Sequence, residues 1–275
     1  MNDAIGAMRT AFDRNREIPQ RQLLGSSMFM PGRVGSISGI KVVSTVPGNP
    51  VGVVVIFDAE GSPIGLVDGP TLTAIRTGAV AGLATDLLAD PAATSMAMLG
   101  AGAMAADQIA AVLAVRHIDR LVIWSRSYER AAELAEATGG LAVRDADEAV
   151  RGTDIVSTAT PSTAPLFSAS SLSGRTHINA VGAYTPSMVE IPPETVTAAF
   201  VVVDDQDAAS HEAGDLLAAG RTPDLDLTTL LEVGAPNHGP LTFFKSVGIA
   251  AQDIAAASVA LDTAERLGLG VDLIT

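Results

Sequence analysis

The central part of this 275-residue chain alternates apolar, strand-like runs with Ala-rich helical segments, and this alternation constrains the fold more than any other feature. The expected elements are strand 95–99, helix 103–115, strand 120–125, helix 129–138, strand 141–143, helix 146–151 and strand 155–160. Further apolar strands are expected at 177–181 and 200–204. Strands that alternate with helices form a parallel sheet covered on both faces, so we predict a doubly wound α/β fold.

The segments on either side follow a different pattern. Residues 1–17 have the spacing of an amphipathic helix, and strands are expected at 40–46 and 51–58 around the turn PGNP at 47–50. GSPIGLVDG repeats strand and turn, and a helix is expected from 71 to 89. We therefore predict a small, largely antiparallel sheet, against which an Ala-rich helix at 248–267 packs. The expected domains are 1–89 with 249–275, and 90–248.

Composition excludes several classes of protein. Hydrophobic residues make up 48% and charged residues 17%, which is typical of a folded chain. The apolar runs are shorter than the roughly 20 residues that cross a bilayer, and no targeting signal opens the chain, so we expect a soluble, cytoplasmic protein without a membrane partner. The formal charge of −14 repels nucleic acid. Cysteine is absent, and the four histidines (His117, His177, His211 and His238) lack ligand spacing, so no metal site is expected.

One motif in the alternating region points to a phosphate-bearing ligand. Gly100, Gly102 and Ala105 form G-x-G-x-x-A between a predicted strand and a predicted helix, which is the context in which this pattern binds a dinucleotide. Gly100 permits a tight turn, Gly102 lets backbone approach a pyrophosphate, and Ala105 lets helix and strand pack closely. Ala101, Ala103 and Met104 complete the expected loop. The alternative is a plain packing corner in an Ala/Gly-rich chain.

The end of the second strand of the array indicates which dinucleotide would bind. An NAD site usually has an acidic residue there, whereas this chain has Ser125, Arg126, Ser127 and then Arg130, with Asp119 at the wrong end of the strand. Hydroxyl and guanidinium groups suit a 2′-phosphate, so NADP(H) is favoured and NAD(H) is possible. The alternative is that the two arginines are only a solvated helix start.

Six blocks along the chain carry a family resemblance. They are GIKVVST, LVDGPTLTAIRTGAVAGLA, LGAGAMA, INAVGAYTPSMVEI, VVVDDQDAASHEAGDL and FFKSVGIAAQDIAAA. Their order resembles that of the ornithine cyclodeaminase/mu-crystallin family. The resemblance implies a homodimer in which a Rossmann-type dinucleotide-binding domain (90–248) is inserted into a substrate-binding and dimerisation domain. The sequence departs from the family pattern at its start, where a short leading segment common in relatives is missing. This difference affects the edge at which the dimer is expected to form.

The family's activities include ornithine and lysine cyclodeamination, alanine dehydrogenation and ketimine reduction, all through a 2-imino acid and a nicotinamide. Such a substrate carries a carboxylate, and Lys41 and Arg76 are cations in otherwise apolar segments. The resemblance makes both of them carboxylate ligands, with Lys41 also in the catalytic set. It adds Arg21 as a third basic residue and Met30-Pro31 as a pocket wall. The alternative is that these cations only extend to solvent at the ends of elements.

Asp204 is the expected catalytic acid or base, because it ends the strand FVVVDD at the carboxyl edge of the sheet and matches the family's proton relay. The alternative is a strand-end cap. Adjacent Asp205 should point the opposite way. Asp207 and Asp215 are expected at helix starts on the surface. His211 is expected as an exposed neighbour of acidic residues; the alternative is an acid or base, because the reference pKa of histidine is near neutrality.

The resemblance also implies loops that contact the cofactor. Thr77 would touch the diphosphate, Thr158, Ala159 and Thr160 would end a strand above the ring, and Val181 and Gly182 would follow the next strand. The run Phe244-Lys245-Ser246-Val247-Gly248 would close the site from the far side, with Lys245, Ser246 and Gly248 as contacts; Lys245 at such a turn could instead be an exposed, solvated lysine.

The choice among the family's activities rests on one position. Ornithine enzymes carry a glutamate two residues before Met-Pro, and here that residue is Met28. An unpaired ammonium beside Met28 and Phe29 would be costly to bury, which argues against a diamine substrate. The leading hypothesis is NAD(P)H-dependent reduction of a 2-imino acid such as pyrroline-2-carboxylate or an N-alkyl imine. The alternatives are an amino-acid dehydrogenase or cyclodeaminase, and a mu-crystallin-like binding protein with little turnover.

Overall fold

The computed structural model describes residues 1–46, 51–172, 174–236 and 239–272. The chain forms two compact units, and each is described by itself. Unit 1 comprises residues 1–2 and 77–248, and unit 2 comprises residues 3–76 and 249–275. The predicted boundaries, 1–89 with 249–275 and 90–248, and the roles of the two domains stay predictions.

Unit 2 is built on an antiparallel sheet. Its elements are α1 (Asn2–Ala11), β1 (Arg16–Glu17), β2 (Gln22–Leu24), β3 (Ser27–Val34), β4 (Ile37–Ser44), β5 (Gly52–Phe57), β6 (Pro63–Asp68), the first part of α2 (Gly69–Leu88), and α10 (Ala250–Leu267). The strand order is β1-β3-β4-β5-β6, β2 pairs with β3, and all of these pairings are antiparallel. The predicted antiparallel sheet is confirmed.

Two details of the prediction for unit 2 are wrong. The helix expected over 1–17 ends at Ala11, because Arg16 and Glu17 pair with β3 as strand β1. Strand β3 was not predicted, since Pro31 and Gly32 interrupt the apolar alternation of SMFMPGRV. The turn expected at 47–50 lies outside the described residues.

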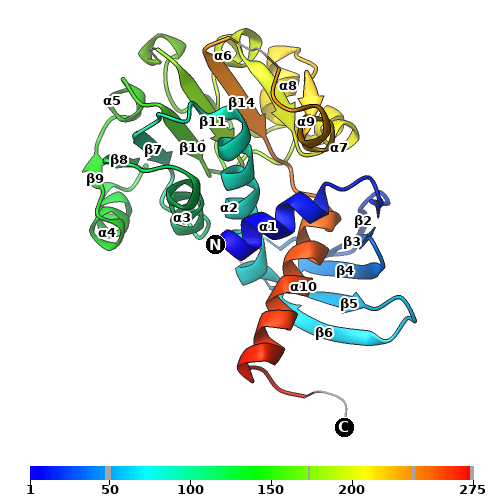
Figure 1. Ribbon diagram of the computed structural model, residues 1–275. Coiled ribbons are helices and arrows are strands. Elements are labelled where there is room, and N and C mark those ends of the chain that lie inside the picture. Colours follow the sequence, from blue (N-terminus) through cyan, green and yellow to red (C-terminus); the bar gives the residue numbers. More distant parts are fainter. Residues whose placement is uncertain (47–50, 173, 237–238, 273–275) are drawn as a thin grey trace. The chain divides into compact units, whose positions relative to one another are not determined.

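Helix α10 packs on one face of this sheet, against β3, β4, β5 and β6 (Figure 1). Small residues permit the close approach: a Cβ on Gly32 would lie 3.0 Å from Ala250 Cβ, and one on Gly65 would lie 2.7 Å from a Leu261 methyl carbon. Alternate residues of a strand share a face, so the face that carries Gly32 also carries Met30. The predicted packing of the C-terminal helix on the antiparallel sheet is confirmed.

Unit 1 is built on a parallel sheet. Its elements are the rest of α2, β7 (Ser95–Leu99), α3 (Ala105–Val115), β8 (Arg120–Trp124), α4 (Tyr128–Thr138), β9 (Leu141–Val143), α5 (Ala146–Val150), β10 (Ile155–Thr158), the 3-10 turn η1 (Ala169–Ser171), β11 (Thr176–Ala180), α6 (Pro193–Ala198), β12 (Phe200–Val203), α7 (Gln206–Glu212), α8 (Gly214–Ala219), β13 (Leu225–Asp226), α9 (Leu227–Val233) and β14 (Leu241–Lys245). The strand order is β13-β12-β14-β11-β10-β7-β8-β9, with parallel pairing throughout.

This sheet confirms the predicted doubly wound fold, because alternate residues of its strands enter two separate apolar cores. Met96 and Met98 of β7 pack with α3 and α4, whereas Ala97 and Leu99 pack with α5 and α6 (Figure 1). Strands β13 and β14 were not predicted; β14 inserts between β11 and β12. Among the described residues, no helix has both the length and the hydropathy needed to span a bilayer.

Candidate functional site

The turn after β7 has the geometry expected of a dinucleotide-binding loop. Gly100 has φ +113°, and a Cβ there would lie 2.7 Å from the backbone oxygen of Ala159, so glycine is required for conformation and for space. The Cβ position of Gly102 has no atom of the described residues within 4 Å. Ala105 begins α3 and is fully buried. The loop therefore leaves open space beside its second glycine, where a phosphate can approach backbone N–H groups.

A cavity of about 210 Å³ lies at this loop. It is lined by Gly100, Ala101, Gly102, Trp124, Ser125, Arg126, Arg130, Ala159, Thr160, Pro161, Ser162 and Leu166. Strands β7 and β10 are neighbours, and the chain leaves β7 toward β8 on one side and returns to β10 on the other. This is the topological switch point, where open α/β sheets bind their ligands. Eight of the predicted cofactor residues line the cavity together.

The arginines that follow β8 lie at this cavity. Arg126 and Arg130 are exposed and line the cavity, and neither guanidinium forms an ion pair within the described part of the chain. Asp119 precedes β8 and lies near His117 instead. Ser127 caps α4: its Oγ accepts a hydrogen bond from the backbone N–H of Arg130 at 3.4 Å. The side chain of Ser127 thus stabilises the helix start.

Two further predicted residues present buried hydroxyl groups. Thr77 is 4% exposed and Thr158 is fully buried, and Oγ1 of each has no hydrogen-bond partner among the described residues. A buried polar atom without a partner costs free energy, and it marks a place where a bound molecule can supply the missing group. These hydroxyls, together with the open space at Gly102, fit a dinucleotide.

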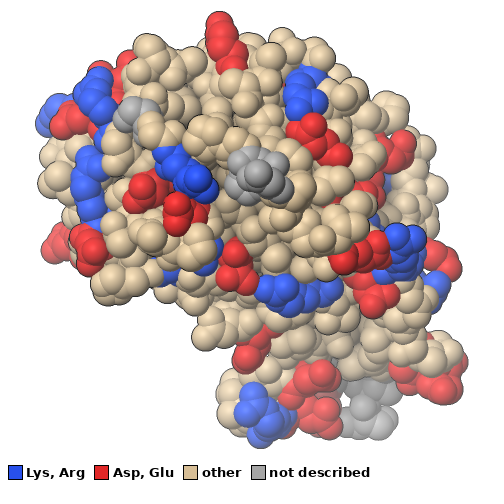
Figure 2. All heavy atoms as spheres, turned by 45° about the horizontal axis from the view of Figure 1, so that its top comes forward, with Lys and Arg blue, Asp and Glu red and all other residues tan. Residues whose placement is uncertain are grey.

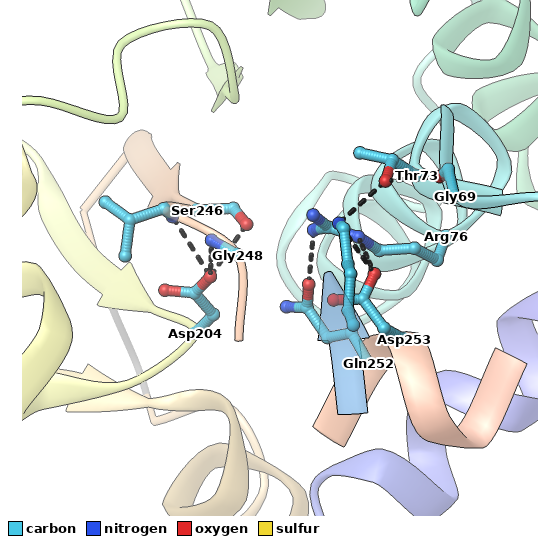
Figure 3. Close-up of polar contacts among 10 residues, drawn as sticks. Gly69, Thr73, Arg76, Asp204, Ser246, Gly248, Gln252 and Asp253 are labelled. Atoms are coloured by element: carbon cyan, nitrogen blue, oxygen red, sulfur yellow. Dashed lines mark hydrogen bonds and ion pairs between the residues drawn. The ribbon is translucent and has the colours of Figure 1, made fainter. Parts of the chain in front are cut away.

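In unit 2, Lys41 and Arg76 come together in a buried cluster around Asp253. Figure 3 shows Arg76 beside Gln252 and Asp253. Lys41 Nζ donates to Thr73 Oγ1 at 2.7 Å and to Asp253 Oδ1 at 3.1 Å. Arg76 Nε donates to the same Asp253 oxygen at 3.0 Å, and its Nη1 donates to Gln252 Oε1 at 2.6 Å. Lys41 is 4% exposed and Arg76 is 6% exposed, so neither extends into solvent.

Burial and two neighbouring arginines affect the charge of Lys41. The pKa of Lys41 is lowered from 10.5 to about 8: burial is the largest cause, Asp253 opposes the shift, and the positive charges of Arg76 and Arg21 add to it. Arg21 is half-buried in the segment between β1 and β2. Met30 is buried and pairs with Lys41 across β3 and β4. Unit 2 therefore brings all four predicted substrate residues into one neighbourhood, and this arrangement can hold a carboxylate.

In unit 1, Asp204 lies directly after β12 and is fully buried (Figure 3). Its Oδ2 accepts hydrogen bonds from Ser246 Oγ at 2.7 Å, Val247 N at 3.0 Å and Gly248 N at 2.7 Å. The carboxylate thus holds the segment that follows β14. Asp205 points elsewhere, as predicted, and caps α7 by accepting from Ala208 N.

The expectations for the segment 244–248 and for Asp215 need correction. Phe244 and Lys245 belong to strand β14, not to a closing loop, and Lys245 is fully buried, not solvated. Its Nζ donates to Asp215 Oδ2 at 2.8 Å. Asp215 begins α8 as predicted, but it is fully buried, because it accepts this bond and those of two backbone N–H groups. Asp207 and His211 are exposed, as expected.

Glu190 extends this network to the cofactor loops. Its carboxylate accepts from Thr160 N at 2.7 Å and Thr160 Oγ1 at 2.9 Å, and from the backbone N–H groups of Gly182 at 2.8 Å and Ala183 at 3.0 Å. Burial raises the pKa of Glu190, and the positive charge of Lys245 lowers it. A Cβ on Gly182 would lie 2.2 Å from Thr160 N, so the loops after β10 and β11 lie in close contact. Glu190 therefore fixes two loops that the sequence assigns to the cofactor.

Sequence reasoning missed four polar residues of these clusters: Thr73, Glu190, Gln252 and Asp253. One feature of the sequence could have indicated the two acidic residues that pair with lysine. The chain contains only two lysines, Lys41 and Lys245, and both are buried in ion pairs with aspartate. Two rare cations require two buried acids, which directs attention to the carboxylates of apolar segments.

The histidines show other roles. His177 is buried and its ring nitrogens contact Thr242 and Asn179, and His117 and His211 are exposed. His238 lies outside the described residues. Among the residues that the structure describes, no group of three His, Cys, Asp or Glu side chains is arranged to hold a metal ion.

Comparisons with known proteins agree with this architecture. Residues 2–267 match the model of the ornithine cyclodeaminase/mu-crystallin family. The chain is 33% identical to a Δ1-pyrroline-2-carboxylate reductase of Bacillus cereus, over 97% of this chain and 90% of that protein. The Thermococcus litoralis Δ1-pyrroline-2-carboxylate reductase, solved with NADH and L-proline, superposes with a TM-score of 0.90 at 26% identity, over 99% of this chain and 94% of that chain.

An archaeal alanine dehydrogenase dimer with bound NAD also superposes with a TM-score of 0.90 at 26% identity, over 99% of this chain and 95% of that chain. The family model and the Bacillus relative both extend over nearly the whole sequence. This protein belongs to the ornithine cyclodeaminase/mu-crystallin family.

Proposed function

We propose that this protein is an NAD(P)H-dependent oxidoreductase that reduces a 2-imino acid, such as Δ1-pyrroline-2-carboxylate or an N-alkyl imine, to the amino acid. The observation that carries the proposal is the burial of Lys41 and Arg76 side by side in unit 2. Two buried cations are costly to maintain, and they are suited to bind the carboxylate of such a substrate. The relatives that reduce pyrroline-2-carboxylate support the same class of reaction.

Each predicted site residue has a role in this proposal. Lys41 and Arg76 bind the substrate carboxylate and fix its orientation, Arg21 adds positive charge, and Met30 forms an apolar wall. Reduction of a neutral C=N bond adds a hydride to carbon and a proton to nitrogen, so the site needs a group that supplies or relays that proton. Asp204 is that group in our proposal.

The dinucleotide is held by unit 1 in this proposal. The cavity residues, Thr77 and Thr158 would bind it, together with the neighbouring residues of the expected set: Ala103, Met104, Ser127, Val181, Gly182, Lys245, Ser246 and Gly248. When bound, the nicotinamide supplies the hydride. Glu190 positions Thr160 and Gly182, and so keeps the loops in place.

We further propose a preference for NADP(H) over NAD(H). Arg126 and Arg130 are exposed at the end of β8, without an ion pair in the described residues. A 2′-phosphate would give both guanidinium groups a partner, whereas the NAD ribose would leave them solvated.

A second candidate is an amino-acid dehydrogenase that runs the same half-reaction from the amine, as the similar alanine dehydrogenase suggests. The buried carboxylate receptor suits either direction. A cyclodeaminase is less well supported, because Met28 offers no charge for a distal ammonium. A mu-crystallin-like binding protein with little turnover would retain the cofactor cavity but would have no need for Lys41, Arg76 and Asp204 together.

We also propose that the protein is a homodimer. The central part of the sheet face opposite α10 is apolar: it carries Phe29, Pro31, Ile40, Val42, Val53, Val55, Phe57 and Leu66 on neighbouring strands, with polar residues such as Arg33, Ser38 and Asp68 toward the edges. These apolar side chains are half-buried, and Leu66 is 46% exposed. A contiguous apolar face of this kind marks an interaction surface, and a second copy of the chain can cover it.

Small molecules are the expected partners, and the cytoplasm is the expected location. On the face drawn in Figure 2, acidic and basic side chains are interspersed. That pattern and the net charge of −14 are unlike a nucleic-acid-binding surface.

The test is a panel assay of the purified protein. We expect NADPH absorbance to fall when Δ1-pyrroline-2-carboxylate or Δ1-piperideine-2-carboxylate is added, with proline or pipecolate as product by mass spectrometry. Oxidation of alanine or proline without imine reduction would favour the dehydrogenase. Ammonia release from ornithine or lysine would favour the cyclodeaminase, and cofactor binding without turnover would favour the binding protein.

A further inference from the structure

Lysine is confined to two buried positions in this protein. Of the 17 Lys and Arg residues only Lys41 and Lys245 are lysine, and their exposures are 4% and 0%. Each pairs with one buried aspartate, Lys41 with Asp253 and Lys245 with Asp215. An ammonium differs from a guanidinium in that burial readily removes its proton, and Asp253 is the group that favours the charged form of Lys41.

The side-chain hydrogen bonds that Asp253 accepts come from two cations. A single oxygen, Oδ1, accepts both Lys41 Nζ at 3.1 Å and Arg76 Nε at 3.0 Å. The other oxygen, Oδ2, is buried and has no hydrogen-bond partner among the described residues. Gln252, the preceding residue of α10, accepts Arg76 Nη1 at 2.6 Å. The first turn of α10 therefore accepts hydrogen bonds from both Lys41 and Arg76. Figure 3 shows Gln252 and Asp253 of this turn beside Arg76.

The charges explain why an anion is needed there. Lys41 and Arg76 repel one another, and both are removed from water. Asp253 reduces the buried charge of the three groups from two positive units to one. One net positive charge is enough to attract a substrate carboxylate, and the remaining donors of Lys41 and Arg76 can bind it.

We propose that Asp253 is a positioning residue of the substrate site: it keeps the Lys41 ammonium charged and holds it beside the Arg76 guanidinium, so that both are ready for a carboxylate. The role in substrate binding rests on the proposed function. The charge state of Lys41, however, is measurable without turnover. The direction of the pKa supports it. Burial lowers the pKa of Lys41 to about 8, Asp253 opposes that shift, and the other charged groups that affect Lys41 are Arg76 and Arg21, which reinforce it.

The composition of the chain permits a direct test. Protein labelled with 13C at the lysine ε-carbon gives two side-chain resonances, one from Lys41 and one from Lys245, and their pH titrations report the two amines separately. In Asp253→Asn we expect the Lys41 midpoint to fall by roughly one pH unit or more, and the Lys245 resonance to stay where it is. An unchanged Lys41 midpoint would overturn the proposal.

Asp215→Asn is the matched control, because it removes the corresponding carboxylate beside Lys245. It should move the Lys245 resonance and leave the Lys41 titration unchanged. If Asp253→Asn does not fold, Asp253→Glu provides the test. This variant keeps a carboxylate, so the Lys41 midpoint should stay near that of the wild type.

Steady-state kinetics provide the second measurement. With the substrate found in the panel assay, Asp253→Asn should raise KM for the imino acid about tenfold at pH 7.5, with little change in KM for NADPH. A KM that does not change, although the Lys41 midpoint falls, would separate Asp253 from substrate binding. If the wild type turns over no imino acid, the proposed function fails, while the titrations still test the pairing of Asp253 with Lys41.

Discussion

Met30 and Lys41 face one another across β3 and β4, on the side of the sheet that α10 covers. The thioether of Met30 does not replace the hydrogen bonds that the ammonium would form with water. Burial is accordingly the largest cause of the lowered pKa of Lys41, which is about 8. The lysine is charged below this pH and neutral above it. The substrate site therefore changes its charge close to physiological pH.

The first prediction is a pH limit on substrate binding. As the pH rises through about 8, Lys41 loses its proton and KM for the imino acid should increase. In Lys41→Arg the cation stays charged at every accessible pH, so this limb of the profile should disappear. The ratio of kcat/KM between the two proteins, from pH 6.5 to 9.5, removes the ionisation of the substrate itself. A ratio that is constant with pH would contradict the assignment.

The second prediction separates two roles of Asp204. As a proton relay its carboxylate is worth about 100-fold or more in turnover, so Asp204→Asn should reduce kcat by that factor. The same carboxylate also holds residues 246–248, and Ser246→Ala removes one of those bonds while keeping the charge. We expect Ser246→Ala to cost only a few-fold in kcat. Equal losses in the two variants would show that Asp204 acts through the segment.

The third prediction concerns the cofactor. Arg126→Ala and Arg130→Ala should each raise KM for NADPH about tenfold and leave KM for NADH nearly unchanged, because only NADPH carries the 2′-phosphate. Arg120→Ala is the matched control, since Arg120 is exposed at the opposite end of the same strand. Unchanged NADPH kinetics in both test variants would mean that the arginines are a solvated helix start.

The fourth prediction concerns assembly. Leu66 and Leu113 are both 46% exposed, the first on the apolar sheet face and the second on α3. Leu66→Glu should convert a dimer to a monomer in sedimentation velocity, because a charge would be buried in the interface, whereas Leu113→Glu should not. A wild-type monomer at micromolar concentration would contradict the proposed dimer.

The sequence predicted the elements that have a local cause. Gly100 requires its positive φ because of the turn itself, and the strands of the parallel sheet alternate with helices whose spacing is visible in the chain. Lys41 and Arg76 were identified because a charge in an apolar run is conspicuous. These features depend on neighbours in the sequence.

The missed residues depend on neighbours in space. Asp253 lies 212 residues from Lys41 in the chain, and Glu190 lies 30 residues from Thr160, so no local pattern pairs them. Asp215 was expected at the surface because a helix start is a normal place for an exposed acid, and only Lys245 explains its burial. Strand β14 was missed because its last residue is a lysine, which is rare in a central strand unless it is paired.

The most direct test of the account is the kinetics of Arg76→Met beside the wild type, with Δ1-pyrroline-2-carboxylate and NADPH. Loss of the guanidinium removes charge-assisted bonds to the substrate carboxylate, so KM for the imino acid should rise about 10- to 100-fold, while the Kd for NADPH from fluorescence titration stays within a factor of two. If both proteins reduce the substrate with the same KM, the buried cations do not bind the carboxylate and the central claim is wrong.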